Sequence, residues 1–300
     1  MADLINLIDG YQKQRVFGVP LESLLETEGR EIPLICEKSI EDLRRRGLDI
    51  EGIFRIPGDT KNVKELKQAY DSERGPDLNI EAYSPHDVGG LFKLFFRELP
   101  NPLFLFASFP HLLAFYGELE ANGGDNSEYL STFLDKLAKL IASLPESNQK
   151  LLRYLFNFFT EIVAQSAVNM MNSRNVAVVF APNLIRPLVD TMETALLSPQ
   201  VNKVLSILID HNDPQFWELV DRHIKEGSRF DLNEVASLPK IKLIQTESPA
   251  PKIRHKRGRI GSVMPMKRGK LSSSSDLKGQ VEEPIRGHER NKSISGSKAT

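Results

Sequence analysis

Apolar residues recur along most of the chain with the spacing of an amphipathic α-helix. Between residues 128 and 144 the apolar side chains fall within about 140° of arc when successive residues are placed 100° apart. A second broad apolar face follows Pro145, and shorter ones lie within residues 33–46 and 201–209. Alternation with a period of two is scarce, and no segment of fixed length repeats. The pattern predicts an all-α fold, a compact single-domain bundle of about seven to nine helices.

Residues that favour helix ends support these helices. Pro33 suits a first helical turn and Gly47 suits a helix end, which places a helix over residues 33–46. Ser147 or Asn148 is available to cap the helix that follows the second break.

The helical pattern stops near residue 222, where the composition changes. We divide the chain into a lead-in over residues 1–16, a helical domain over residues 17–222 and a tail over residues 223–300. From residue 240 onward 15 Lys and Arg outnumber 5 Asp and Glu, a net charge of +10, whereas the preceding residues carry −11. No aromatic residue follows Phe230, so the tail cannot bury enough apolar surface to offset its ordering entropy. We predict that this basic, Ser-rich tail is disordered.

Several classes of protein are disfavoured by what the sequence lacks. No stretch approaches the roughly 20 apolar residues that span a bilayer, and the first residues lack the features of a signal peptide, so we expect a cytoplasmic protein. Cys36 is the only cysteine, which excludes an internal disulfide and a cysteine metal cluster. Phosphate-loop, dinucleotide-binding, zinc-protease and nucleophile-elbow motifs are missing, and the six histidines are scattered. We therefore expect no active site, metal or cofactor of the chain's own.

A polar side chain without an obvious structural role occurs in the segment GLDIEGIFRIPGDTK, residues 47–61. Arg55 stands there between apolar neighbours, after one helix has ended and before the next begins near Asp59. We place it on an extended connector closed by Pro57 and Gly58. Taken alone, an arginine in such a position is most simply a surface residue whose charged end is solvated.

The segment SPHDVGGLFKLFFRELPNPLF, residues 84–104, predicts a helix with two distinct faces. One face is apolar, and the other carries small or polar residues, which are His86, Gly89, Gly90, Lys93 and Arg97. Adjacent glycines cost a helix roughly 1 kcal/mol each relative to alanine, which suggests that a docked partner approaches the backbone closely. Like charges four residues apart are mildly unfavourable, so Lys93 and Arg97 indicate an anionic partner, with a solvated face as the alternative.

Asparagines punctuate the segment VNMMNSRNVAVVFAPNLIRP, residues 168–187. Asn172 or the serine after it can cap a short apolar helix that ends at Pro182. For Asn172 and Asn175 a capping or turn role is favoured. Asn183 follows the break and has a weaker structural reason for its place.

Together these segments resemble the RhoGAP domain, the GTPase-activating domain for the Rho family of small GTPases. Five blocks occur in the family's order over about 200 residues. They are FGVPLESLL, LRRRGLDIEGIFRIPG, KLFFRELPNPLF, LPESNQKLLRYLFNFF and NSRNVAVVFAPNLIRP. Two positions depart from the usual pattern: Ile-Pro follows Arg55 where Val-Ser is more frequent, and Ala181 stands where glycine is usual. Neither change removes a polar group that the chemistry needs.

The resemblance implies a function and assigns residues to it. Arg55 matches the arginine finger that the family inserts into its GTPase. Lys93 and Arg97 match the family's basic pair, and Asn183 matches its asparagine after proline. The chain would then activate a GTP-bound Rho-family GTPase without being an enzyme itself, and GTP and magnesium would belong to the partner. A non-catalytic GTPase-docking or membrane scaffold domain with the same fold is the alternative.

The dense basic run KIRHKRGRI, residues 252–260, suggests a ligand for the tail. An anionic membrane surface, contacted through residues 252–270, is the more useful interpretation and would make the protein membrane-peripheral. Nuclear localisation and a solvated linker are the alternatives, whereas sequence-specific nucleic-acid binding is disfavoured because stacking aromatics are missing. Ser262 and Ser293 each lie three residues after an arginine, and phosphorylation there would weaken the attraction to a membrane.

Overall fold

The computed structural model describes residues 15–72, 77–124 and 127–232, and all regular structure in these ranges is helical. It comprises twelve α-helices and one short 3₁₀ helix, η1 (Ile80–Ala82). The α-helices are α2 (Leu21–Glu28), α3 (Leu34–Arg46), α4 (Thr60–Tyr70), α5 (Pro85–Glu98), α6 (Ser108–Ala121), α7 (Ser127–Ala142), α8 (Glu146–Ala164), α9 (Ser166–Asn169), α10 (Ser173–Leu184), α11 (Met192–Ala195), α12 (Ser198–Asp210) and α13 (Pro214–Glu226). The all-α prediction is confirmed. The helices outnumber the seven to nine expected partly because α9 and α11, with four residues each, are too short to show a periodic pattern.

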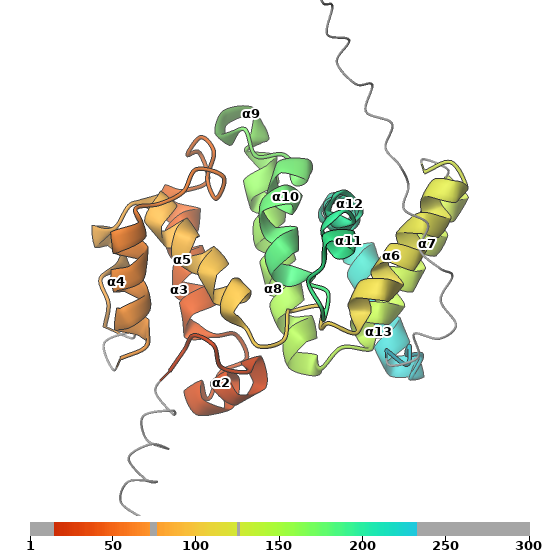
Figure 1. The fold of residues 1–300 in the computed structure, drawn as a ribbon, viewed down its shortest axis with the longest axis horizontal. Helices are drawn as coiled ribbons and strands as arrows, with labels where there is room; N and C mark the ends of the chain where they lie inside the picture. Colours follow the sequence, from red (N-terminus) through yellow and green to blue (C-terminus); the bar gives the residue numbers. More distant parts are fainter. Residues whose placement is uncertain (1–14, 73–76, 125–126, 233–300) are drawn as a thin grey trace, which may run out of the picture. The chain divides into compact units, whose positions relative to one another are not determined.

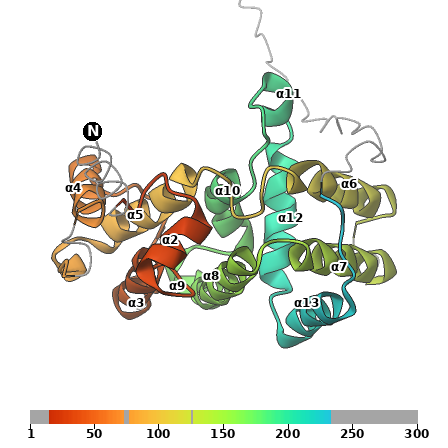
Figure 2. The ribbon, with the colours of Figure 1, turned by 90° about the horizontal axis from the view of Figure 1, so that it is seen from below.

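Helix α10 occupies a central place in the packing, because it contacts α5, α8 and α12 (Figures 1 and 2). Helix α5 in turn packs on α3 and α4, and α7 contacts both α6 and α13. A hydrophobic cluster of buried side chains from Phe17 to Val220 links these helices. Side chains on α5 and α10 are therefore positioned by the same core.

Side-chain caps fix the starts of the helices that carry the candidate site. Ser84 and Asp87 form a capping box at the start of α5, and Asn172 caps α10, both at predicted positions. Asp59 caps α4 by accepting from the backbone N–H of Lys61 at 2.7 Å.

The predicted cap of α8 is wrong. Pro145 precedes the helix, and neither Ser147 nor Asn148 caps its first turn. Instead the buried Asn148 side chain donates from Nδ2 to the carbonyl oxygen of Leu103 at 2.8 Å. The Asn148 amide is therefore used in a contact with a distant loop and not in a cap of its own helix.

Helix α10 does not end at Pro182, contrary to the prediction. It continues to Leu184, and the N–H of Ile185 donates to the carbonyl oxygen of Ala181 at 2.9 Å. Proline removes one backbone hydrogen bond, but the packing of α10 in the core keeps the last turn helical. Asn183 therefore lies within that turn and not after a break.

The packed structure extends past residue 222. Helix α13 ends at Glu226, and the ring of Phe230 lies 5.3 Å from the ring of Phe115, centroid to centroid. The N–H of Phe230 donates to Ser143 Oγ at 2.7 Å, which ties this segment to the end of α7.

Predictions for the tail lie outside the described residues. These are its disorder, the basic run within residues 252–270, and the switch at Ser262 and Ser293. Within the described ranges, no helix combines the length and the apolar character that crossing a bilayer requires.

Candidate functional site

Arg55 lies in a tight succession of turns between α3 and α4, residues 47–58, which we call the Arg55 turn. The backbone N–H groups of Arg55 and Ile56 both donate to the carbonyl oxygen of Gly52, at 2.9 and 2.8 Å. Gly52 and Phe54 adopt left-handed conformations, with φ of +67° and +66°. The predicted extended connector is therefore wrong, because a glycine and a buried aromatic residue fold the segment back on itself.

Phe54 anchors the Arg55 turn in the core. Its ring is 1% exposed and lies 4.9 Å from the ring of Phe180 and 6.1 Å from those of Phe92 and Phe158. A left-handed conformation costs a residue other than glycine about 1–2 kcal/mol. Burying a phenylalanine ring contributes about 1.5–3 kcal/mol and offsets that strain. With Phe54 directed into the core, the neighbouring Arg55 is exposed to solvent.

The two glycines of α5 accommodate side chains of the same chain. A Cβ atom on Gly89 would lie 3.1 Å from Cδ1 of Phe54, and one on Gly90 would lie 2.8 Å from Cγ2 of Val63 in α4. Both distances are shorter than ordinary carbon contacts, so glycine allows these side chains to reach the helix backbone. The expectation that a docked partner explains the glycines is wrong.

Lys93 of α5 supports the Arg55 turn by a hydrogen bond to its backbone. Its Nζ donates to the carbonyl oxygen of Phe54, the residue that precedes Arg55. Burial, and secondarily the positive charge of Arg97, lower the pKa of Lys93 below its ordinary value. The ammonium group of Lys93 is thus partly shielded from water and lies near a second positive charge, and its hydrogen-bond acceptor is a carbonyl oxygen.

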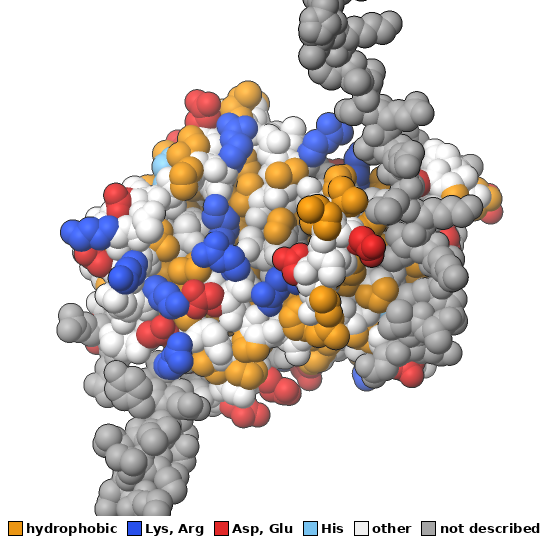
Figure 3. Space-filling view, viewed as in Figure 1, with side chains coloured by type: hydrophobic (Ala, Val, Ile, Leu, Met, Phe, Trp, Pro, Cys, Tyr) orange, Lys and Arg blue, Asp and Glu red, His pale blue; other side chains and the backbone are white. Residues whose placement is uncertain are grey.

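Positive charge is left uncompensated on this face. Arg55 and Arg97 are exposed, and neither side chain forms a hydrogen bond or ion pair with the described residues. Figure 3 shows Lys and Arg side chains spread across the face over α5, with hydrophobic side chains beside them over α10 and α11. Such a surface favours an anionic ligand that also presents apolar contacts.

Asn183 and Arg186 lie where the end of α10 approaches α5. Asn183 is half-buried and donates from Nδ2 to the carbonyl oxygen of Val179 at 3.0 Å. The Arg186 guanidinium donates to the carbonyl oxygens of Arg97 and Leu99 at 3.0 and 2.5 Å. The structure thus brings Lys93 to the Arg55 turn, and it places Arg97 and Asn183 on adjacent helices without a hydrogen bond to Arg55.

The far end of the Arg55 turn is fixed by Asp87 of α5. This buried carboxylate accepts from the N–H of Asp59 at 2.7 Å, from Asn62 Nδ2 at 3.1 Å and from the hydroxyl of Ser84 at 2.7 Å. A Cβ on Gly58 would lie 2.6 Å from the Asp87 Cα, so only glycine fits there. Burial raises the pKa of Asp87, but the hydrogen bonds together outweigh burial and hold the pKa below its usual value.

The near end of the turn is held by a residue that sequence reasoning missed, Asn169 at the end of α9. Its side chain is fully buried, and its backbone carbonyl oxygen accepts from the N–H of Gly52 at 2.8 Å. Only the run of asparagines in residues 168–175 hinted at it. Asn175 has its predicted turn role, because its Nδ2 donates to the carbonyl oxygen of Met170 at 2.8 Å.

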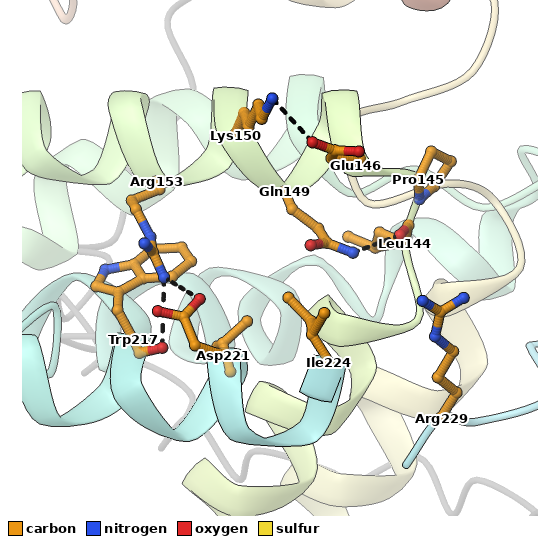
Figure 4. A pocket seen from close by; sticks show the side chains of 11 residues that line it. Leu144, Pro145, Glu146, Gln149, Lys150, Arg153, Trp217, Asp221, Ile224 and Arg229 are labelled. Carbon is orange, nitrogen blue, oxygen red and sulfur yellow. Dashed lines mark hydrogen bonds and ion pairs between the residues drawn. The ribbon is translucent and has the colours of Figure 1, made fainter. Parts of the chain in front are cut away.

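A metal centre and a ligand pocket are the two other kinds of site to compare with the Arg55 turn among the described residues. No three His, Cys, Asp or Glu side chains there are arranged to hold a metal ion. A pocket between α8 and α13 is lined by charged side chains and Trp217 (Figure 4). Two of its three cations, Lys150 and Arg153, are already paired with carboxylates, as the dashed lines in Figure 4 show. The Arg55 turn, with α5 and the end of α10, is therefore the candidate site.

The chain belongs to the RhoGAP domain family, whose model matches residues 33–189. The Rho GTPase-activating protein gacY of Dictyostelium discoideum is 36% identical over 209 residues, which cover 67% of this chain and 27% of that protein. Human Rho GTPase-activating protein 24 is 34% identical over 206 residues, which cover 67% of this chain and 26% of that protein. The chain therefore spans about a quarter of the length of these curated relatives.

Solved structures agree with the family. The crystal structure of human Rho GTPase activating protein 15 superposes with a TM-score of 0.55 at 27% identity. The superposition covers 66% of this chain and 90% of that one. The predicted resemblance is confirmed for the family and for the fold.

Proposed function

We propose that this protein accelerates GTP hydrolysis by a Rho-family small GTPase, and that Arg55 enters the partner's nucleotide site. The observation that carries the proposal is an exposed arginine without an internal partner among the described residues, on a turn whose backbone is held on both sides. The side chain of Arg55 is presented by a rigid support, as a ligand for an outside anion requires.

The chemistry of the partner explains why an arginine would serve. Hydrolysis of GTP builds negative charge on the β–γ bridging oxygen and the γ-phosphate oxygens. A planar guanidinium can donate to two of these oxygens at once, which an ammonium cannot match. Arginine fingers supplied to Ras-type GTPases accelerate hydrolysis by a factor on the order of 10³ to 10⁵. GTP and magnesium would belong to the partner, and the chain would supply only the side chain.

Lys93, Arg97 and Asn183 would each have a separate role in positioning Arg55 or in binding the GTPase. Lys93 would hold the Arg55 turn through the Phe54 carbonyl and add positive potential to the site. Arg97 is exposed and free to contact the switch regions of the GTPase. Asn183 uses Nδ2 within α10, which leaves its Oδ1 to accept a hydrogen bond from the partner. A cytoplasmic location would suit such a partner, and the basic tail, residues 252–270, would attract the protein to an anionic membrane surface.

The alternative is a domain that docks a GTPase without accelerating hydrolysis. The same basic surface would serve both functions, but docking alone does not require Arg55 to stand on a strained turn. The two functions differ in what Arg55 contributes: to the rate of hydrolysis in the first, and to affinity at most in the second.

Single-turnover GTP hydrolysis by a panel of Rho-family GTPases separates the two functions. The variants are Arg55→Ala and, as a matched control, Arg222→Ala, another exposed arginine that lies on α13. We expect Arg55→Ala to abolish acceleration while affinity for the GTP-bound state is largely kept, and Arg222→Ala to behave as wild type. Equal acceleration by Arg55→Ala and wild type would show that Arg55 is not the finger.

A further inference from the structure

We propose that Asn169 is a positioning residue for Arg55, which it controls through the near end of the Arg55 turn. This inference rests on the proposed function, since it concerns the geometry with which the guanidinium is delivered. Asn169 lies at the end of the four-residue helix α9, which connects α8 to α10 on the side of the Arg55 turn.

The Asn169 side chain joins three separate segments of the chain. Its Nδ2 donates to the carbonyl oxygens of Leu48 and Ile162, both at 2.8 Å. Its Oδ1 accepts from the N–H of Met171 at 2.7 Å. The side chain is 0% exposed, so water cannot replace these partners without opening the structure. One amide thus links the start of the Arg55 turn to α8 and to the segment before α10.

The backbone of Asn169 makes the second link to the turn. Gly52 N–H donates to its carbonyl oxygen at 2.8 Å, and the Gly52 carbonyl oxygen in turn accepts from the N–H of Arg55. Only one residue, Gly52, therefore stands between the hydrogen bond to Asn169 and the hydrogen bond to Arg55. A displacement of Asn169 is transmitted directly to the Arg55 backbone.

The conformation around Asn169 is itself maintained by its side chain. Met170, the next residue, has φ of +59°, a left-handed conformation that methionine adopts only under constraint. The hydrogen bond from Met171 N–H to Asn169 Oδ1 spans this residue and holds it in place, together with the hydrogen bond from Asn175 Nδ2 to its carbonyl oxygen. Without the amide, the α9–α10 connection can relax and carry the Asn169 carbonyl oxygen away from Gly52.

The three supports of the Arg55 turn act at different points. Asn169 holds Leu48 and Gly52 at the near end, Lys93 holds Phe54 in the middle, and Asp87 holds the far end. Residues 48–52 have no other side-chain hydrogen bond to the described residues outside the turn. Misplacement of a catalytic group by about 1 Å can cost about 10²-fold in rate, so this end determines how well Arg55 reaches the phosphate oxygens.

Asn169→Ala and Asn148→Ala form a matched pair for the test. Asn148 is also a buried asparagine that donates to a distant carbonyl oxygen at 2.8 Å, but its acceptor is Leu103 and not the Arg55 turn. Both variants should lower the melting temperature, and Asn169→Ala by more, because the Asn169 amide makes three hydrogen bonds and the Asn148 amide two. With the GTPase that wild type accelerates best, we expect Asn169→Ala to lower the maximal single-turnover rate about 10²-fold, with less than threefold change in half-saturating concentration. Asn148→Ala should keep the rate within twofold.

Amide hydrogen exchange gives a readout that does not depend on a partner. Gly52 and Arg55 N–H groups should exchange at least tenfold faster in Asn169→Ala than in wild type, and at the wild-type rate in Asn148→Ala. If Asn169→Ala is unfolded by circular dichroism, Asn169→Ser, which keeps one polar group, takes its place with the same expected results.

The outcomes separate the two proposals. A wild-type maximal rate in Asn169→Ala, an equal loss in Asn148→Ala, or unchanged exchange at Gly52 overturns the positioning role, even where Arg55→Ala abolishes acceleration. If wild type accelerates no GTPase, the proposed function fails and the catalytic part of this inference fails with it. Exchange at Gly52 then still decides whether Asn169 holds the turn.

Discussion

Two groups of cations on this domain differ in whether the fold pairs them with carboxylates. In the pocket between α8 and α13, Lys150 pairs with Glu146 (Figure 4) and also with Glu31, and these hydrogen bonds raise its pKa to about 12. On α5, Lys93 finds only a carbonyl oxygen, and burial together with Arg97 lowers its pKa. The pKa of a lysine is therefore lowered on one surface of this domain and raised on another.

The arginines repeat this contrast. Arg153 lies 4.7 Å from the centre of the Trp217 ring and donates to Asp221 at 2.6 Å, so its charge and its planar face are both used. Arg55 has neither kind of partner among the described residues. A cation that is paired with a carboxylate can contribute to the stability of the fold. Cations held close together without counter-ions reduce that stability, and an anionic partner can relieve their repulsion. This difference in pairing, and not the size of a pocket, is the reason for placing the proposed site at the Arg55 turn and α5.

The largest expected effect comes from changing Arg55 to lysine, with Arg153→Lys as the matched change in the pocket between α8 and α13. Arg55→Lys keeps the charge but loses the paired donors, so we expect acceleration of GTP hydrolysis to fall on the order of 10² to 10³. Arg153→Lys should leave acceleration within twofold. Single-turnover hydrolysis measures both. Similar activity of Arg55→Lys and wild type would mean that charge alone is needed.

Removing one buried aromatic residue from each region should separate stability from activity. Phe54→Ala and Trp217→Ala should each lower the free energy of unfolding by about 3–5 kcal/mol, measured by urea denaturation. Only Phe54→Ala should also reduce acceleration, because its ring sets the Arg55 turn. If the folded fraction of Trp217→Ala loses acceleration equally, the anchoring role assigned to Phe54 is not specific.

Glycine substitutions give a smaller effect with opposite signs. Gly58→Ala forces a Cβ against the backbone of Asp87 and should destabilise the protein by about 1–3 kcal/mol. Gly117 in α6 has nothing within 4 Å of its added Cβ, so Gly117→Ala should stabilise the protein by about 0.5–1 kcal/mol. Thermal and urea unfolding measure both changes. Destabilisation by Gly117→Ala would contradict the open space described there.

The smallest expected effect concerns the pKa values of the two lysines. Arg97→Ala should raise the pKa of Lys93 only part of the way toward 10.5, because burial is the larger cause of its shift. Glu146→Ala should lower the pKa of Lys150. Titration of the lysine side chains by NMR measures both. Complete recovery to 10.5 in Arg97→Ala would show that repulsion, and not burial, dominates.

These pKa shifts also give the sign of the pH dependence. The folded-state pKa of Lys93 lies below that of the unfolded chain, so the unfolded state holds more protons between the two values. The contribution of Lys93 to stability therefore rises with pH through that interval. For Lys150 the folded-state pKa is the higher one, so its contribution is present below 10.5 and is lost as the pH rises toward about 12.

Much of the site could be predicted because it depends on local patterns. The capping box at Ser84 and the cap at Asn172 follow from residue types next to a helix start. The sequence also predicts a surface position for Arg55, and Arg55 is exposed. Two predictions drawn only from neighbouring residues in the sequence were wrong. These are the docked partner expected at Gly89 and the helix end expected at Pro182.

The sequence alone determined the helical periodicity, the starts of α4, α5 and α10, and the family, because these depend on residues within a few positions of one another and on matched blocks. Only the tertiary structure decided what each site residue touches. Phe54 fills the space left by Gly89, Lys93 reaches the Phe54 carbonyl oxygen, and Asn169 bonds Leu48 across 121 positions of sequence. Such pairs form because the core brings α5, α9 and the Arg55 turn together, and no local preference specifies that arrangement.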